Sequence, residues 1–84
     1  MNMIKIELDG DFLILEIWRT RDDYIRILYH KTEEERLAQQ LCGLLLKGFT
    51  FTGKYNEEEK RAREVLKNIL GILGWRYLAD SIPQ

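Results

Sequence analysis

Few side chains in this sequence have the chemistry of a catalytic nucleophile or a soft metal ligand. The chain has one histidine, His30, one cysteine, Cys42, and one serine, Ser81. Two nitrogen or sulfur ligands are too few for a structural zinc site, which takes four. We expect Cys42 to be a buried thiol among the leucines of a helix and Ser81 to lie in a frayed C-terminal segment. The sequence therefore predicts a protein that is not an enzyme and has no metal and no cofactor.

A second chemical signal comes from aromatic residues in the stretch 47–51. Lys47-Gly48-Phe49-Thr50-Phe51 resembles part of the ribonucleoprotein motif of RNA-binding sheets, in which aromatic side chains stack on bases. The stretch departs from that motif at Thr50, where the motif has Gly or Ala, and the expected order of elements also differs. We therefore favour a segment whose two phenylalanines fill the core.

Charge and composition exclude several classes of protein. The chain has 84 residues, of which 13 are basic and 14 acidic, and its formal net charge is -1. A protein that coats nucleic acid or an anionic membrane needs a basic surface, and this balance argues against it. The longest apolar run is Leu44 to Leu46, and the N-terminus alternates charged and apolar residues. With one cysteine there is no internal disulfide, so we expect a cytoplasmic protein that does not bind membranes.

The N-terminal third has the pattern of a β-hairpin. Residues 4–8 alternate strictly between apolar and charged, Asp9-Gly10 is a strong hairpin signal, and residues 12–19 form the next predicted strand. A type I′ turn at Asp9-Gly10 would pair Leu8 with Asp11 and Ile6 with Leu13. This register places one apolar set on a single face: Ile4, Ile6, Leu13, Leu15 and Ile17.

A third strand is predicted over residues 24–30, after a turn at residues 21–23. A loop of that length would place Trp18 opposite Arg26 and Glu16 opposite Leu28. The inner face would then also carry Ile25, Ile27 and Tyr29.

Two helices follow the strands. Thr32 and Glu35 have the spacing of a capping box, so the first helix is expected to run from there to about Lys47, with Gly48 after its end. Its predicted buried residues are Leu37, Ala38, Leu41, Leu44 and Leu45. Residues 49–52 are either a loop or a short fourth strand. The second helix is expected from Asn56 to a bend or end near Gly74, with an apolar stripe of Ala62, Val65, Leu66, Ile69, Leu70, Ile72 and Leu73.

These elements predict one α+β domain over residues 1–84. It consists of a three-stranded antiparallel β-meander followed by two α-helices packed on one sheet face. The other face would be left to solvent, unless the second helix or the segment 75–79 folds over it.

The outer sheet face is the predicted functional surface. Aromatic residues mixed with arginine are typical of protein interfaces. We therefore predict a small adaptor or stoichiometric inhibitor, of the type that phages and mobile elements encode, which binds a protein partner or forms a homodimer. The predicted binding residues are Phe12, Ile14, Trp18, Tyr24, Arg26 and Leu28.

Nucleic-acid binding through the same sheet is the alternative. Four basic residues are expected around the second turn: Arg19, Arg21, Arg26 and Lys31. Three-stranded sheets backed by helices bind DNA in some integrase-like and plant regulatory domains. Glu16, Asp22 and Asp23 interrupt the basic group, so this hypothesis ranks second.

Overall fold

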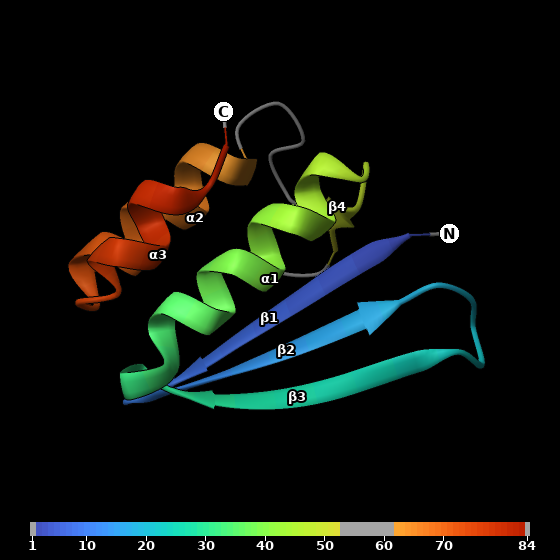
Figure 1. Cartoon of the computed structure of the whole chain (residues 1–84), viewed down its shortest axis with the longest axis horizontal. Helices are drawn as coiled ribbons and strands as arrows, with labels where there is room; N and C mark the ends of the chain where they lie inside the picture. The colour runs from blue at the N-terminus through green and yellow to red at the C-terminus, as the bar shows by residue number, and fades with distance from the viewer. Residues whose placement is uncertain (1, 53–61, 84) are drawn as a thin grey trace.

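A computed structural model describes residues 2–52 and 62–83 of the chain (Figure 1). Three strands come first and are followed by a short 3₁₀ turn, a helix, a two-residue strand and two more helices. The elements are β1 (Met3–Asp9), β2 (Phe12–Trp18), β3 (Tyr24–His30), η1 (Lys31–Glu33), α1 (Glu34–Leu46), β4 (Thr50–Phe51), α2 (Ala62–Ile72) and α3 (Arg76–Ser81).

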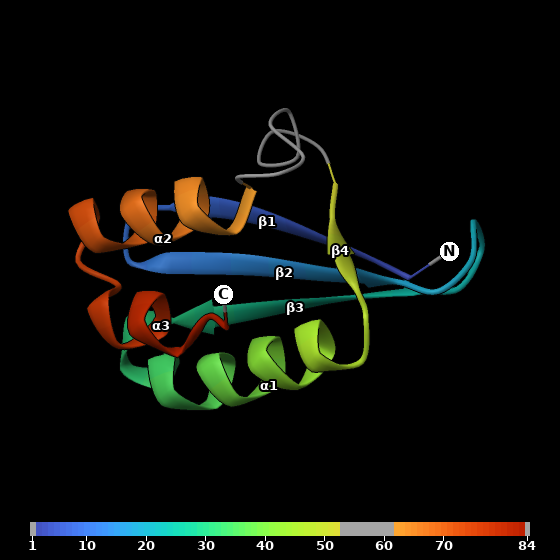
Figure 2. The same ribbon diagram turned by 90° about the horizontal axis from the view of Figure 1, so that it is seen from above.

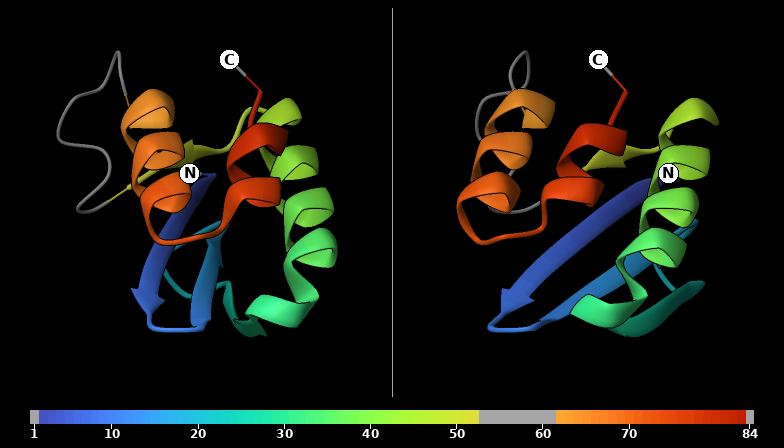
Figure 3. Two further views of the ribbon diagram at one scale, coloured as in Figure 1. Left: turned by 90° about the vertical axis from the view of Figure 1, so that its left-hand side faces the viewer. Right: turned by 60° about the vertical axis from the view of Figure 1, so that its left-hand side comes forward.

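The strands form one sheet in the order β3-β2-β1-β4. The first three are antiparallel neighbours, and β4 adds to β1 in parallel. All three helices lie on the same side of the sheet, with α3 between α1 and α2 (Figures 1–3). The predicted α+β fold, with an antiparallel meander followed by helices on one face, is confirmed. Strand β4 and helix α3 are minor additions to it.

The inner face of the sheet forms half of the core. Ile4, Leu13 and Leu15 are fully buried, and Ile6, Ile17 and Tyr29 are nearly so. From the helical side the core receives all five residues predicted for the first helix: Leu37, Ala38, Leu41, Leu44 and Leu45. The assignment of apolar residues to the inner face is therefore right for β1 and β2.

Ile25 is the exception on this face, because its side chain is 52% exposed. It lies at the start of the edge strand β3. Figure 2 shows that the strands extend beyond the helices at the end that carries the β2–β3 loop. No described helix reaches Ile25, so its predicted burial is wrong.

The two-residue turn between β1 and β2 lies one position later in the sequence than predicted. Asp9 pairs with Phe12 and Leu8 with Leu13, so the two-residue loop is Gly10-Asp11. Gly10 has a φ of +58°, and no described residue other than glycine has a positive φ. A type I′ turn at Asp9-Gly10 would need positive φ at Asp9 as well, whereas the observed loop needs it only at its first position, as in a type II′ turn. The pairing shifts by two residues, which leaves every side chain on its predicted face.

The β2–β3 connection shifts in the same way. Trp18 pairs with Tyr24 and Glu16 with Arg26, so the loop comprises residues 19–23 and the predicted three-residue turn is wrong. The carbonyl oxygen of Asp23 accepts hydrogen bonds from the N–H groups of Arg19 at 2.9 Å and Thr20 at 3.4 Å. These bonds stabilise the longer loop, and the rings of Trp18 and Tyr24 stack directly behind it at 4.1 Å.

The first helical turn is capped by His30 and Glu33 instead of Thr32 and Glu35. His30 Nδ1 accepts from the N–H of Thr32 at 3.2 Å, while Glu33 Oε1 accepts from the N–H of His30 at 3.1 Å. A capping residue needs extended backbone angles. His30, the last residue of β3, has φ -87° and ψ 156°, whereas Thr32 lies inside η1.

Helices α1 and α2 end in the same Schellman motif. After α1, Gly48 has a φ of +92° and the N–H of Phe49 donates to the carbonyl of Leu44 at 3.1 Å. After α2, Gly74 has a φ of +88° and the N–H of Trp75 donates to the carbonyl of Leu70 at 2.8 Å. In each case the aromatic residue that follows the glycine is buried. The predicted roles of both glycines are confirmed.

The C-terminal part contains the largest departures from prediction. The predicted start of the second helix at Asn56 lies outside the described residues. Leu66 and Leu70 of the predicted stripe are fully buried, but Ile72 is 84% and Leu73 49% exposed, so the stripe is wrong at its end. Ile72 lies two positions after Leu70, on the opposite side of the helix.

Helix α3 was not predicted, and it holds the segment that was expected to fray. Ser81 Oγ donates to the carbonyl of Tyr77 at 2.7 Å, and Ile82 is buried. At the other end of α3, Glu34 Oε1 of α1 accepts from the N–H of Leu78 at 2.7 Å. A carboxylate from a distant helix thus caps a helix that is too short to be stable alone.

Two glycines near the end of α2 give a matched test of this geometry. Gly74→Ala should lower the free energy of unfolding by about 1–2 kcal/mol, because Ala is strained at positive φ. A Cβ there would also meet Lys31 Nζ. Gly71→Ala, inside α2 with open space around it, should raise the free energy of unfolding by about 0.5–1 kcal/mol. Urea unfolding measures both, and equal effects of the two variants would contradict the assignment.

Tyr29 gives the fold a dependence on alkaline pH. Burial raises the pKa of its phenol above the ordinary value of 10.0; Arg36 lowers this pKa and Glu33 raises it by smaller amounts. The unfolded chain therefore loses this proton first, so the free energy of unfolding should fall as pH rises through the pKa of the folded state. Urea unfolding from about pH 8 to about pH 11 should show a smaller fall for Tyr29→Phe than for the exposed control Tyr24→Phe. An identical fall in both would show that Tyr29 contributes nothing.

Candidate functional site: the outer face of the sheet

The outer face of the sheet consists of four rows that each cross β1, β2 and β3. The strand register defines them, because directly paired residues point to the same side. From the β2–β3 loop toward η1 the rows are Met3–Trp18–Tyr24, Lys5–Glu16–Arg26, Glu7–Ile14–Leu28 and Asp9–Phe12–His30. All six residues predicted for partner binding lie on this face.

No described helix covers the outer face (Figure 1). Phe12 is 41% exposed, Tyr24 50% and Leu28 58%, while Ile14 and Trp18 are half-buried by their neighbours in the sheet. The alternative prediction, in which the second helix or the segment 75–79 folds over this face, is wrong for the residues that the structure describes. An apolar surface is therefore open to solvent.

The apolar residues of the outer face form two separate clusters. The loop-end cluster consists of Met3, Trp18 and Tyr24, and its two rings are nearly parallel, with an interplanar angle of 10°. The turn-end cluster consists of Phe12, Ile14, Leu28 and His30, in which Phe12 and His30 meet edge to face at 5.0 Å. The sequence predicted one patch, but the charged row Lys5–Glu16–Arg26 lies between the two clusters.

Arg26 lies in this charged row and reaches two carboxylates. Its guanidinium lies 3.7 Å from Glu7 and 3.9 Å from Glu16. Glu16 also accepts a hydrogen bond from Trp18 Nε1 at 3.0 Å, and only 13% of its side chain is exposed. Glu16 thus orients both the arginine and the indole, which gives the centre of the face a fixed arrangement. The ion pairs themselves add little stability, because Arg26 is largely exposed.

The structure does not bring the four predicted nucleic-acid contacts together. Arg19 and Arg21 lie in the β2–β3 loop, whereas Lys31 follows the opposite end of β3. Lys31 Nζ donates to the carbonyl of Leu73 at 3.4 Å, at the C-terminus of α2. Its expected place at the second turn is therefore wrong.

The residues with nucleophilic or basic chemistry are also separated. Cys42 is half-buried, so its predicted burial is right only in part. His30 ends β3, before α1 begins, whereas Cys42 lies eight positions after the first residue of α1, roughly 12 Å along the helix. The Nδ1 atom of His30 is already engaged with Thr32. These two side chains cannot act as a catalytic pair in this arrangement.

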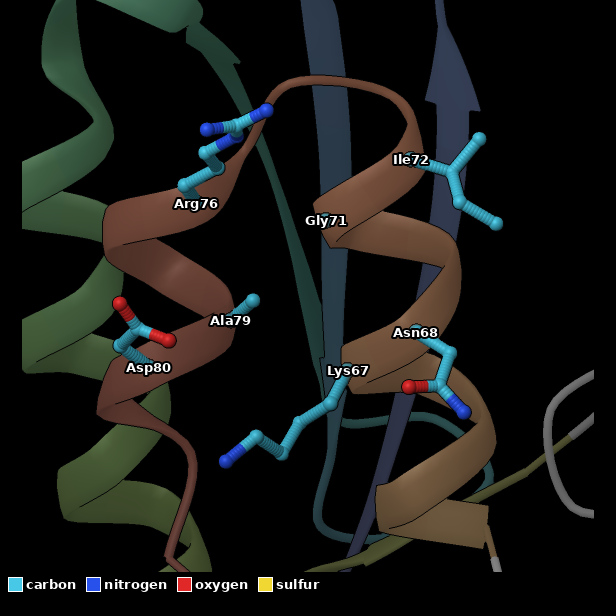
Figure 4. Close-up of a pocket in the computed structure, with 7 residues that line it drawn as sticks. All are labelled: Lys67, Asn68, Gly71, Ile72, Arg76, Ala79 and Asp80. Atoms are coloured by element: carbon cyan, nitrogen blue, oxygen red, sulfur yellow. The ribbon is translucent and has the colours of Figure 1, made fainter.

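On the helical side, two hollows are lined by described residues. One, of about 400 Å³, lies between α1 and α3 and has Cys42, Leu46, Tyr77 and Ser81 in its lining. The other, of about 530 Å³, lies between α2 and α3 (Figure 4). Its charged residues are Lys67, Arg76 and Asp80, with no cysteine, serine or histidine in the lining. Neither hollow has a set of groups that resembles a known catalytic site.

Phe49 and Phe51 are 6% and 4% exposed, respectively. Buried rings cannot stack on bases, so the prediction that they fill the core is confirmed. Residues Thr50 and Phe51 form β4, which answers the open question about the stretch 49–52.

Two exposed apolar residues outside this site differ in how far the sequence indicated their exposure. The strand alternation places Ile25 on the inner face, which predicts burial. It is exposed because the described helices do not extend far enough to cover it. Leu46, 73% exposed, directly follows the buried stripe of α1, and its position off that stripe was the available signal.

Other kinds of site find little support. Among residues 2–52 and 62–83, no group of three or more His, Cys, Asp or Glu side chains could hold a metal ion. None of the helices in the same ranges is long and apolar enough to cross a membrane. Comparison of the chain with protein-family models, curated proteins and solved structures gave no match. Function has to be argued from the outer face itself.

Proposed function

We propose that this chain is a small, non-enzymatic protein-binding module, an adaptor or a stoichiometric inhibitor, that binds its partner through the outer face of the sheet. The exposure of Phe12, Tyr24 and Leu28 on a face without a covering element carries this proposal. Phe12 and Leu28 lie in adjacent rows of this face, and contiguous apolar side chains indicate an interaction surface more strongly than scattered ones do.

The composition of the face also favours a protein partner. Tyr, Trp and Arg are the residues that most often dominate binding energy at protein interfaces, and Trp18, Tyr24 and Arg26 lie next to one another here. The stacked rings and the bonds of Glu16 hold these side chains in place before binding. A preformed surface loses less side-chain entropy on binding than a flexible one.

A role without catalysis fits the separation of the reactive side chains. His30 lies apart from Cys42 and Ser81, which line the same hollow between α1 and α3, and the lining of neither hollow contains His30. A cytoplasmic location and a phage or mobile-element origin belong to the same proposal, and they rest on the sequence alone.

Nucleic-acid binding is the weaker alternative. Arg26 faces two carboxylates, and Lys31 is engaged with the end of α2. Only Arg19 and Arg21 remain in one place, in a loop that also carries Asp22 and Asp23.

Two exposed positions allow a matched test of the proposed surface. Leu28→Glu places a charge on the outer face, and Ile72→Glu places the same charge on α2, on the helical side. Both side chains are more than half exposed, so both variants should fold. A protein captured from a lysate by the wild type should be retained by Ile72→Glu and reduced at least about tenfold by Leu28→Glu, a loss of about 1.4 kcal/mol.

Mass spectrometry identifies the captured protein, and circular dichroism checks that each variant is folded. Loss of capture with Ile72→Glu but not with Leu28→Glu would place the binding surface elsewhere. If no protein is captured above the level of a blank matrix, the proposal fails.

The alternative has its own measurement. If the sheet binds nucleic acid, affinity for a mixed DNA or RNA probe should fall steeply with salt, and Arg21→Ala combined with Arg26→Ala should weaken it further. We expect no salt-sensitive binding at about 0.15 M salt. Binding that the double variant abolishes would overturn the protein-binding proposal in favour of this one.

A further inference from the structure

Strand β3 is an edge strand over its whole length. It is the first strand in the order β3-β2-β1-β4, and among residues 2–52 and 62–83 it pairs with β2 alone. At the opposite edge, β4 pairs with the start of β1. Unpaired strand edges invite pairing with another chain, and proteins usually protect them with proline, lysine, a bulge or a covering element. The seven residues of β3 contain no proline and no lysine, and their pairing with β2 has no bulge.

The hydrogen bonds at both ends of the β2–β3 ladder show which backbone groups point to the open edge. The N–H of Lys31 donates to Asp11, and the N–H of Arg19 donates to Asp23, so the odd-numbered residues of β3 face β2. The N–H groups of Tyr24, Arg26 and Leu28 therefore point away from the sheet. The N–H of His30 points the same way, but it donates to Glu33.

The side chains along this edge are also open. Tyr24, Ile25 and Leu28 are each at least half exposed. Arg26 is the only charged residue of the strand, and it reaches toward Glu7 and Glu16 of its own sheet. The edge thus presents unpaired donors between apolar side chains, which is the chemistry that another β-strand recognises.

We propose that β3 pairs in antiparallel orientation with β3 of a second copy, with the two-fold axis at Ile27. In this register the three free N–H groups of Tyr24, Arg26 and Leu28 meet the carbonyls of His30, Leu28 and Arg26 of the second copy. The N–H of His30 would face the carbonyl of Tyr24 of the second copy, but it already donates to Glu33. This register therefore uses all three unpaired donors and leaves one of its four donor positions in each chain without an interchain bond.

A second copy suits the edge because the strand is complementary to itself. On the inner side, Ile27 meets its own copy, and the exposed Ile25 lies beside Tyr29 of the second copy, so apolar area is buried that one chain leaves open. A shift of the axis to Arg26 would place two arginines directly opposite each other, which is unfavourable. With the two-fold axis at Ile27, Arg26 of one copy lies opposite Leu28 of the other.

The same pairing would join the two apolar clusters of the outer face. Tyr24 of one copy lies opposite His30 of the other, so the loop-end cluster of each chain adjoins the turn-end cluster of its neighbour. Across the two-fold axis, these two clusters therefore adjoin without the charged row between them. The inference stands independently of the proposed function, since the pairing uses the strand edge and leaves the outer face open.

Disulfide cross-linking tests the register directly, in a Cys42→Ser background. Residues at position 27 would form a pair without hydrogen bonds, with Cα atoms about 4.5 Å apart, within the range of a disulfide. Ile27→Cys should therefore give a covalent dimer under mild oxidation, whereas Ile25→Cys should not. Ile25 is the more exposed of the two, so random collisions would favour the opposite result.

Light scattering gives the complementary measurement without cysteines. We expect the wild type at about 100 µM to have twice the mass of the 10.0 kDa chain. Leu28→Pro removes only an edge N–H, so it should fold and return the mass to that of one chain, while Leu28→Ala, which keeps the N–H, should remain a dimer. A monomeric wild type, or stronger cross-linking at position 25 than at 27, would overturn the proposal. The monomeric result would leave the edge to an extended segment of a different protein.

Discussion

The pleat of strand β2 is the constraint on which this structure depends. Leu13 and Leu15 on one side are fully buried, while Ile14 and Glu16 on the other side belong to the outer face. Full burial of a leucine stabilises the fold by about 1.5–3 kcal/mol. A slip of one residue would exchange the two sides and lose that burial, whereas a slip of two residues keeps it. The central strand therefore fixes which side receives the helices and which side they leave uncovered.

The helical layer depends on contacts between distant parts of the chain. Helices α1 and α2 end in locally encoded glycine motifs, but each motif is followed by an aromatic residue that only the assembled core can bury. Trp75 is fully buried, and its Nε1 has no hydrogen-bond partner among the described residues. Helix α3, only six residues long, is held by Trp75 at its start and by Glu34 of α1.

The outer face is a direct consequence of this one-sided packing. Helices of this length cover one side of the sheet and only part of its extent, which leaves both the outer face and the start of β3 open. A small chain has little surface to spare for unused apolar groups. Two different surfaces are therefore exposed: a face with aromatic clusters and an edge with unpaired donors. A strand-paired second copy would use backbone groups of Tyr24, Arg26 and Leu28, whereas a protein on the outer face would contact the side chains of these residues.

The sequence by itself determined the elements whose signals are local. Alternation in residues 4–8 and 12–18 gave the correct faces, and Gly48 and Gly74 gave the helix ends, because side-chain parity and positive φ depend on the chain alone. Tertiary structure decided the pairing registers, since the pairing in both hairpins differs by two residues from the predicted register without changing any face. It also decided the exposure of Ile25 and the place of Lys31, which depend on how far the helices extend over the sheet. Local rules assign a side chain to a face, but only the packed molecule determines what covers that face.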